Sequence, residues 1–503
     1  MKKKSLIFAL SLSCLALASC FGGGSGDDNT SVAPTPTPSD TVIPDSEGKV
    51  EFKNVELKVW SIIGDPDQTY LNKVNRAFND LYKGQIQANI TALTTSSFYT
   101  SLANTIQSDP ESAPDIILYH SERLTSLIDN NVIIPLDDYF QYTGMEFNRE
   151  DYLDNVIEEC YGKNQKLYGV PLDVHAGVWY VRSDILEKNG FAKPTTLQEF
   201  KNVCNGLIEL NNKGQMWHRA MNKNKPLACE WSQLKLDNFN PVCMYSGDNI
   251  ESGWIPQTAV FQNGGTLVNE NGRPAWNTQG LKDTMSMFRD WQSGNGYSGK
   301  FVAPNLDANS IWTNLASGNA VFTCEGPWWS EERLNEYEEV LADKVDSEGK
   351  TYEPLDIMNM SKLYAQDASK DYANNIYGVG HCFSITRTCD SNLKRAAGLL
   401  YAQYMTTHAA EYMQGGHLPA SKTVLNSAQY KNSSFYERYL KEFGDPNNFK
   451  MLGRTPFYEE VYVSLKNVYQ DIFSPNYASK SVDEIVNTRY QEALNAIQSK
   501  EDL

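Results

Sequence analysis

The chain has 503 residues, with 62 acidic against 44 basic side chains, and its formal net charge is −18. A surface this acidic repels a phosphate backbone, so nucleic acid is excluded as an expected partner. A single hydrophobic core stops growing beyond ~250–300 residues, so a chain of this length is expected to fold as at least two lobes.

The N-terminus has the pattern of an export signal. Lys2, Lys3 and Lys4 precede a short apolar run, and L-A-S-C ends at Cys20. The run is too short for a transmembrane helix, which needs ~20 apolar residues, but fits a signal peptide over residues 1–19. L-A-S-C resembles a bacterial lipobox, so Cys20 is expected to carry the lipid of the mature N-terminus. Ordinary cleavage that leaves Cys20 free is the alternative.

Residues 20–50 are rich in Gly and Ser, then in Pro and Thr, and include V-A-P-T-P-T-P-S. Such a composition cannot bury a core and predicts a disordered tether. Loss of the three lysines takes the mature net charge to −21. We therefore expect an extracytoplasmic protein, anchored to the bacterial cell membrane through its lipidated N-terminal cysteine.

The first folded region alternates strand and helix patterns. Apolar alternation predicts a strand over residues 55–61, and two further strands are expected over residues 86–91 and 115–119, with helices between them and after the third. Ser121 is expected to cap the helix after the third strand. This order favours an α/β fold with a parallel, doubly wound sheet. Ligands bind beyond the carboxyl ends of such strands. That rule selects Trp60, Asp65, the turn at residues 94–95, and residues 119–123.

Residues 168–186 read Y-G-V-P-L-D-V-H-A-G-V-W-Y-V-R-S-D-I-L, the point where the chain is expected to pass between lobes. Gly169 and Pro171 punctuate this segment, and Val178–Val181 reads as a buried strand. Asp173 and His175 lie just before that strand. A carboxylate and an imidazole suit a cleft between lobes better than a core.

The later chain is less regular. Thr196 with Glu199 and Ser481 with Glu484 form expected capping boxes. Residues 216–251 are expected to be long loops, and a helix is expected to begin near residue 254. Residues 331–370 are acidic and weakly patterned, which favours a surface excursion. Residues 378–385 and 415–420 are expected to return the chain between the lobes.

Enzyme motifs such as G-x-S-x-G and H-E-x-x-H are missing from the sequence. Residues 294–300 match G-x-x-x-x-G-K, but Phe301 stands where a phosphate loop needs Ser or Thr, so a turn is expected. The six histidines have no ligand spacing, so neither a metal nor a cofactor is expected. Seven cysteines remain beyond Cys20. Cys229 with Cys243, or Cys382 with Cys389, could pair, and the spacing does not decide.

Aromatic residues are the informative feature, with 10 Trp and 28 Tyr. A sugar offers an apolar C–H face, which suits an indole ring, and a belt of hydroxyls, which suits Asp, Glu, Asn, Arg and His. Gly326 and Pro327 form a turn after a strand and follow Glu325. They are expected to present Trp328 at the carboxyl end of a sheet.

Three motifs carry a family resemblance: Y-G-V-P-L-D-V-H, then W-Y-V-R-S-D-I-L-E-K-N-G with P-T-T-L-Q-E-F, and G-P-W. They resemble the extracellular solute-binding proteins of family 1, the maltose-binding-protein-like sugar-binding lipoproteins of ABC importers. The resemblance implies a two-lobe periplasmic-binding-protein-like fold, with doubly wound sheets joined by hinge crossings. It places lobe 1 at residues 51–172 and 380–420, and lobe 2 at residues 173–379 and 421–503.

The resemblance also implies site residues. Trp328 matches the first Trp of a sugar-stacking motif, Trp254 precedes G-G as another stacking aromatic does, and His175 replaces a carboxylate of maltose binders. The expected ligand-binding residues are Asp65, Tyr119, Glu122, Arg123, Asp173, His175, Trp254, Glu325, Trp328, Phe457 and Tyr458.

The sequence thus predicts a monomeric, lipid-anchored binding protein without catalytic activity. It is expected to capture a carbohydrate, an oligosaccharide by its aromatic count, for the permease subunits of an ABC importer. The alternatives are the same fold binding a peptide or polyamine, a surface-anchored glycan-degrading enzyme, and a surface glycan-binding module without a permease.

Overall fold

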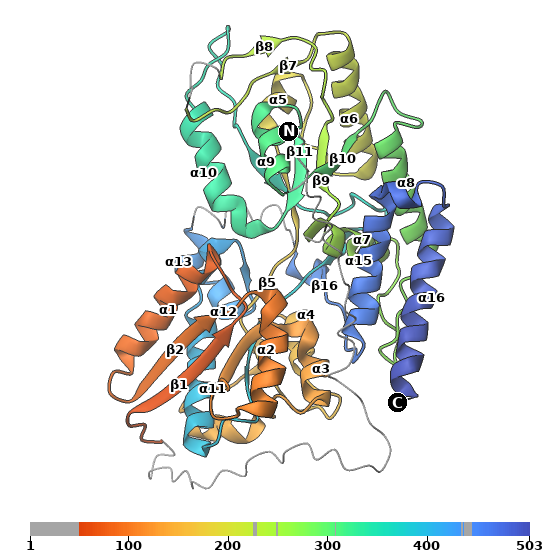
Figure 1. Cartoon of the computed structure of the whole chain (residues 1–503). Helices are drawn as coiled ribbons and strands as arrows, with labels where there is room; N and C mark the ends of the chain where they lie inside the picture. The colour runs from red at the N-terminus through yellow and green to blue at the C-terminus, as the bar shows by residue number, and fades with distance from the viewer. Residues whose placement is uncertain are drawn as a thin grey trace, which may run out of the picture.

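The computed structural model describes residues 50–224, 229–247, 250–306, 308–433, 436 and 445–502 (Figure 1). The expected signal peptide, Cys20 and residues 20–49 of the expected tether lie outside these ranges. Within them, no helix combines the length and the apolar character that crossing a membrane requires.

The first sheet has the strand order β2-β1-β3-β14-β4. Strand β1 runs parallel to β2 and β3, as the alternating pattern predicts, whereas β14 is antiparallel to both β3 and β4. The sheet is therefore mixed, because a strand from late in the chain completes it. Its strands are β1 (Val55–Ser61), β2 (Ile86–Ala92), β3 (Ile116–His120), β4 (Val170–Pro171) and β14 (His381–Ile385).

Amphipathic helices cover this sheet in the lower half of Figure 1. Helix α1 buries Leu71, Val74 and Phe78, which recur at helical spacing. Helix α11 lies against β1 and β14. The helices of this half are α1 (Asp67–Leu81), α2 (Thr95–Ser108), α3 (Leu124–Asp129), α4 (Asp154–Ile157), α11 (Asn392–Thr407), α12 (Lys422–Leu425) and α13 (Ala428–Lys431).

The second sheet has the order β10-β9-β11-β6-β12 and lies in the upper half of Figure 1. Strand β6 occupies the predicted residues and is buried along its length. The strands of the second sheet are β6 (Val178–Val181), β9 (Val242–Tyr245), β10 (Val302–Leu306), β11 (Phe322–Glu325) and β12 (Asp356–Met358). The accompanying helices are α5 (Ser183–Lys188), α6 (Leu197–Asn212), α7 (Ile250–Gln262), α8 (Gln279–Ser293), α9 (Ala308–Ser317), α10 (Ser330–Leu341), α15 (Ser464–Phe473) and α16 (Val482–Glu501).

Short strands join the first half, which is built on the first sheet, to the second half, which is built on the second sheet (Figure 1). Strand β5 pairs antiparallel with β15, His175 bridges to Val379, and β13 pairs parallel with β16. After β15 the chain stays beside the first half, since Ser421 bridges to Tyr152, and it reaches α15 only after β16. The bounds are β5 (Asp173–Val174), β13 (Ile376–Tyr377), β15 (Leu418–Pro419) and β16 (Phe449–Lys450).

Several local predictions are confirmed. The Thr196 side chain accepts from the backbone N–H of Glu199 at 3.3 Å, and Ser481 accepts from Glu484 at 3.1 Å. Gly294 ends α8 with φ of 80°, so the G-x-x-x-x-G-K match is a turn. The seven cysteines of the described residues are all buried and none of them forms a disulfide, so neither possible pair is bonded there.

Three local predictions are wrong. The acidic segment after Glu331 is no surface excursion: α10 buries Leu334, Tyr337 and Leu341 at helical spacing, and β12 joins the second sheet. The expected loop region after residue 216 contains β7 (Trp217–His218), β8 (Ser232–Gln233) and β9, strands too short to leave a clear pattern. Ser121 caps no helix, because a 3-10 turn separates it from α3.

Candidate functional site

Four imidazoles meet where the connecting segments leave the sheets. His120 ends β3 and lies opposite His381, the first residue of β14, in the strand register. His175 follows β5, and His417 precedes β15, the strand that pairs with β5. Sheet pairing therefore brings together side chains that are far apart in the sequence.

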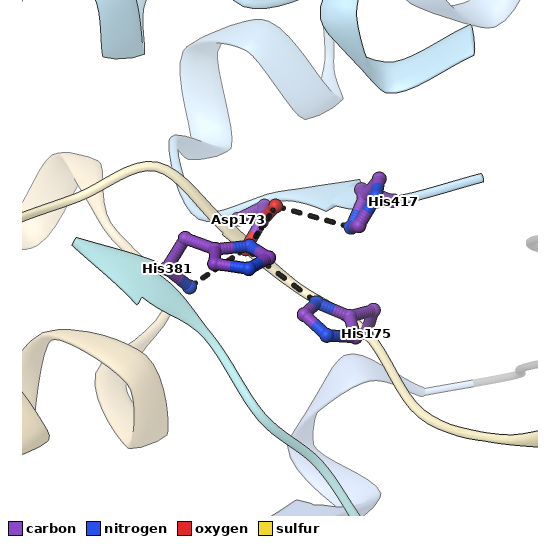
Figure 2. A group of neighbouring side chains, drawn as sticks. All are labelled: Asp173, His175, His381 and His417. Carbon is purple, nitrogen blue, oxygen red and sulfur yellow. Dashed lines mark hydrogen bonds and ion pairs between the residues drawn. The ribbon is translucent and has the colours of Figure 1, made fainter. Parts of the chain in front are cut away.

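The carboxylate of Asp173 lies at the centre of this group (Figure 2). Its Oδ1 accepts a hydrogen bond from the backbone N–H of His381 at 2.8 Å, and its Oδ2 lies 2.9 Å from His381 Nδ1. The Tyr412 hydroxyl donates to Oδ2 at 2.9 Å. Asp173 is fully buried, which disfavours its charge, but His381 and His417 outweigh burial and hold its pKa well below the usual value.

His417 lies between two carboxylates. Its Nε2 is 2.9 Å from Asp67 Oδ2 at the start of α1, and its Nδ1 is 3.1 Å from Asp173 Oδ2. Burial opposes protonation of His417, but Asp173 and Asp67 outweigh it and raise its pKa to about 10. The ring of Tyr412, in the 3-10 turn Tyr412–Gly415, stacks on the imidazole with centroids 5.0 Å apart.

His175 is the least bonded member of the group. Its Nδ1 lies 3.7 Å from Asp173 Oδ1, and its ring stacks on that of His381 with centroids 4.8 Å apart. Burial lowers the pKa of His175 to about 3. Burial, with His381 and His175 nearby, also lowers the pKa of His120 well below its usual value. Both rings are therefore neutral at pH 7.

Two tryptophans of the second half contact His175. The ring centroid of Trp254, near the start of α7, lies 5.5 Å from that of His175. The ring centroid of Trp328, in the 3-10 turn Pro327–Trp329 after β11, lies 6.0 Å from it. The indole rings are perpendicular to each other. Trp254 is buried and Trp328 is partly exposed. Both tryptophans, which the sequence predicts to bind ligand, therefore lie beside the segment that carries Asp173 and His175.

The segment before His417 approaches the Trp328 turn closely. Gly416 has φ of 98°, and a Cβ there would lie 2.4 Å from the Pro327 carbonyl oxygen. Tyr70 of α1 also donates a hydrogen bond to Glu331 of α10. The first half therefore contacts the second half both at this turn, through Gly416, and at the helix that follows it, through Tyr70.

A second group surrounds Glu122 and Arg123, which follow β3. The buried Glu122 carboxylate accepts a hydrogen bond from the Tyr377 hydroxyl, and burial raises its pKa. Arg123 pairs with Glu459 at 2.7 Å and lies over the Tyr458 ring, 3.5 Å from its centroid. Tyr377 also contacts Trp254, with centroids 6.4 Å apart, so this group adjoins the tryptophans.

The remaining predicted residues lie in different surroundings. Tyr119 is fully buried in the first sheet, where its hydroxyl meets Ser384 Oγ at 2.9 Å. Successive strand residues face opposite ways, so its neighbour His120, not Tyr119, joins the imidazoles. Asp65 is exposed, and Asp67 contacts His417 instead. Phe457 is partly buried beside Tyr458.

Glu325 ends β11, and its Oε1 accepts from the backbone N–H of Gly326 at 3.1 Å. Burial raises its pKa to about 7. The carboxyl therefore changes charge near neutral pH, one turn away from Trp328.

Sequence reasoning missed four participants: Asp67, His381, Tyr412 and His417. His120 lay in the selected range 119–123 but was not among the expected ligand-binding residues. Residues 378–385 and 415–420 were already expected to pass between lobes, and each contains one histidine. The positions of those histidines in crossing segments were the available signal, because crossing segments meet in space.

Comparison with known proteins gives a consistent result. The family described as bacterial extracellular solute-binding protein matches residues 63–355. Among solved structures, the GacH receptor of Streptomyces glaucescens has a TM-score of 0.65 at 12% identity over 88% of this chain and 98% of its own.

Two further structures are similar. The cyclic alpha-maltosyl-1,6-maltose binding protein of Arthrobacter globiformis has a TM-score of 0.63 at 14% identity, over 88% of this chain and 99% of its own. The sugar-binding protein MalE of Xanthomonas citri has a TM-score of 0.64 at 14% identity, over 89% and 98%. At such identities the likeness shows the fold, which is the predicted two-lobe periplasmic-binding-protein-like α/β fold.

Proposed function

Because the chain belongs to the bacterial extracellular solute-binding proteins, we propose that it captures a carbohydrate of oligosaccharide size and delivers it to the permease subunits of an ABC importer. The observation that carries this proposal is the pair of perpendicular indole rings of Trp254 and Trp328, with centroids 6.0 Å apart, beside His175. An indole face suits the C–H face of a sugar ring.

Polar groups near the tryptophans suit sugar hydroxyls. Neutral His175 both donates and accepts, Glu325 accepts when ionised, and Arg123 donates through a planar guanidinium. Buried polar partners of this kind discriminate sharply, since a ligand lacking a matching hydroxyl would leave them unpaired. Tyr119 is left out of the proposed set because its hydroxyl already pairs with Ser384.

Similar structures support a sugar ligand. The GacH receptor was solved with acarbose, and the Arthrobacter protein is named for a cyclic maltosyl-maltose. Another similar protein, CpMnBP1, was solved with mannobiose and with mannotriose. The maltosyl-maltose, mannobiose and mannotriose are oligosaccharides and agree with the proposed size class, whereas a further similar structure was solved with the monosaccharide tagatose.

The proposed mechanism is capture without bond breaking. A ligand that contacts both halves stabilises the arrangement in which they meet. Tyr70 with Glu331, and Gly416 with Pro327, are contacts that such closure would maintain. The proposed lobes are residues 51–172 with 380–420, and residues 173–379 with 421–503, although the chain after Ser421 stays beside the first half until it reaches α15.

The proposed cellular setting follows from the N-terminus. Export by the signal peptide of residues 1–19 and lipidation of Cys20 would anchor a monomer, and the tether would let it reach a permease in the same membrane. Acyl chains contribute ~0.8 kcal/mol per buried CH₂, so more than one chain holds a folded domain at the membrane.

A thermal-shift panel of glycans, polyamines and peptides tests the proposal. A ligand at ~100 times its dissociation constant adds ~2.7 kcal/mol to the free energy of unfolding, which shifts the melting temperature by several degrees. Shifts with oligosaccharides support the proposal. Shifts with polyamines or peptides alone would reject it, and release of reducing ends from intact glycans would indicate an enzyme instead.

A further inference from the structure

We propose that Asp173, His175, His381 and His417, here named the histidine cluster, bind one divalent transition-metal ion of the zinc class. The ligand atoms would be a carboxylate oxygen of Asp173 and the Nδ1 atoms of the three histidines. One possible ligand atom from each of the four residues lies within 4.8 Å of the other three, and all four residues are buried (Figure 2).

The separations approach those of a tetrahedral site. Zn–N and Zn–O bonds of about 2.0–2.1 Å place tetrahedral ligand atoms about 3.3 Å apart. The Asp173 oxygens lie 2.9 Å from His381 Nδ1, 3.1 Å from His417 Nδ1 and 3.7 Å from His175 Nδ1. These values bracket the expected one. Ligand atoms as far apart as 4.8 Å, the limit for this group, would have to close by about 1.5 Å on the ion.

Two of the nitrogens that face the cluster lack a hydrogen bond of good geometry. Within the described part of the chain, Nδ1 of His175 and Nδ1 of His417 are buried and meet no hydrogen-bond geometry, although they lie 3.7 and 3.1 Å from the Asp173 carboxylate. A buried polar atom without a partner costs free energy, so native proteins seldom leave one. A metal ion would give both nitrogens a partner at once.

Further partners match the surroundings of known metal ligands. A metal-binding histidine donates its other ring N–H to a carboxylate or carbonyl, which fixes the tautomer. His417 does so through Nε2, 2.9 Å from Asp67 Oδ2. The Tyr412 hydroxyl and the His381 backbone N–H hold the Asp173 carboxylate in place.

Donor type and charge select the ion. Three imidazoles and one carboxylate suit zinc, copper, nickel or cobalt, whereas magnesium and calcium prefer oxygen. Two buried carboxylates, Asp67 and Asp173, face the cluster, and a divalent ion with neutral imidazoles would balance them. Four protein ligands leave no open position, so the site would be structural.

Such an ion would tie together three connecting segments. Asp173 and His175 belong to the first, His381 to the second and His417 to the segment that pairs with the first at β15. The metal would hold these segments together beside the tryptophans. This inference is independent of the proposed carbohydrate function, because its test contains no sugar.

The test uses the full chain, purified through a tag without histidine, stripped with a chelator and titrated with Co²⁺ and then Zn²⁺. We expect one Co²⁺ per chain, with the intense visible absorption of a four-coordinate complex, and its displacement by one Zn²⁺. His175→Asn is the sharpest variant, because His175 Nδ1 makes no hydrogen bond whose loss would unfold the protein. It should weaken binding by at least tenfold.

His408→Asn is the matched control, since His408 is exposed at the end of α11 and should leave binding unchanged. Asp173→Asn should abolish metal binding. Circular dichroism checks that each variant is folded. If the wild-type chain takes up no metal, or if His175→Asn binds as tightly as wild type, the cluster is a hydrogen-bonded network and the proposal is overturned.

Discussion

The indole rings of Trp254 and Trp328 lie at 86° to each other with centroids 6.0 Å apart. They come from different elements of the second half, and both contact His175 in the segment that leaves the first half. An edge-to-face pair of this kind gains about 0.5–1.5 kcal/mol beyond its buried area. The pair is thus held in place before a ligand arrives.

Replacing the partly exposed indole tests its role in binding. Trp328→Ala should raise the dissociation constant for the bound oligosaccharide about 30-fold, equivalent to about 2 kcal/mol, because the stacking face is removed. Isothermal titration measures the change. Trp329→Ala is the control: Trp329 is also partly exposed but lies near Arg333, and its loss should change affinity less than threefold. Equal losses in the two variants would contradict the assignment.

Glu325 predicts a specific pH dependence. Burial raises its pKa from 4.5 to about 7, so the folded protein holds a proton that the unfolded chain releases between these values. Below pH 4.5 the carboxyl is neutral in both states and costs nothing. Between pH 4.5 and 7 the unfolded chain ionises and the folded protein does not, so the free energy of unfolding falls across this window and stays lower above pH 7.

Glu325→Gln should therefore match wild type near pH 4 and become more stable than wild type at pH 8. Each pKa unit corresponds to 1.36 kcal/mol, and partial exposure reduces the gain to about 1–2 kcal/mol. Urea unfolding of the ligand-free protein at both pH values measures it. A constant difference between the two proteins across this range would refute the prediction.

A buried charge network stabilises the second half. Asp184 accepts from Arg182 Nε at 2.9 Å and from Arg219 Nε at 2.7 Å, and all three side chains are fully buried. Asp184→Asn should lower the free energy of unfolding by about 3–5 kcal/mol, because it leaves buried cations without a counter-charge. Glu187→Gln, which breaks an exposed pair with Lys350, should cost less than about 1 kcal/mol. Similar costs in denaturant unfolding would show that burial is not the cause.

The contact between α1 and α10 predicts an effect on closure. Tyr70→Phe removes the hydroxyl that donates to Glu331, so the ligand-bound state should lose about 1 kcal/mol, a fivefold weaker affinity. The stability of the free protein should hardly change, because Tyr70 is near the surface. Small-angle scattering with and without ligand measures compaction. Unchanged affinity would show that this contact does not contribute to closure.

Strong periodicity made much of the fold predictable. The alternation of Val55, Leu57 and Val59 and the helical spacing of Leu71 and Phe78 each reflect one buried face. The acidic α10 could not be recognised, since its charges outnumber the three apolar residues that it buries. Mixed strand direction was also hidden, because β14 enters the first sheet from late in the chain.

The candidate site was only partly predictable for a related reason. Asp173 and His175 stood out because polar residues beside a buried strand are unusual. His381 and His417 did not, since their partner Asp173 lies in another segment and sequence spacing carries no information on it. Tyr119 shows the converse: one residue of register decides whether a side chain faces the core or the site.

The most direct measurement of the central claim is a crystal structure of the protein with the glycan that gives the largest thermal shift. We expect a sugar ring against the indole face of Trp328, with Trp254 and His175 in contact with the same glycan. A glycan bound elsewhere, with both indoles away from it, would contradict the account.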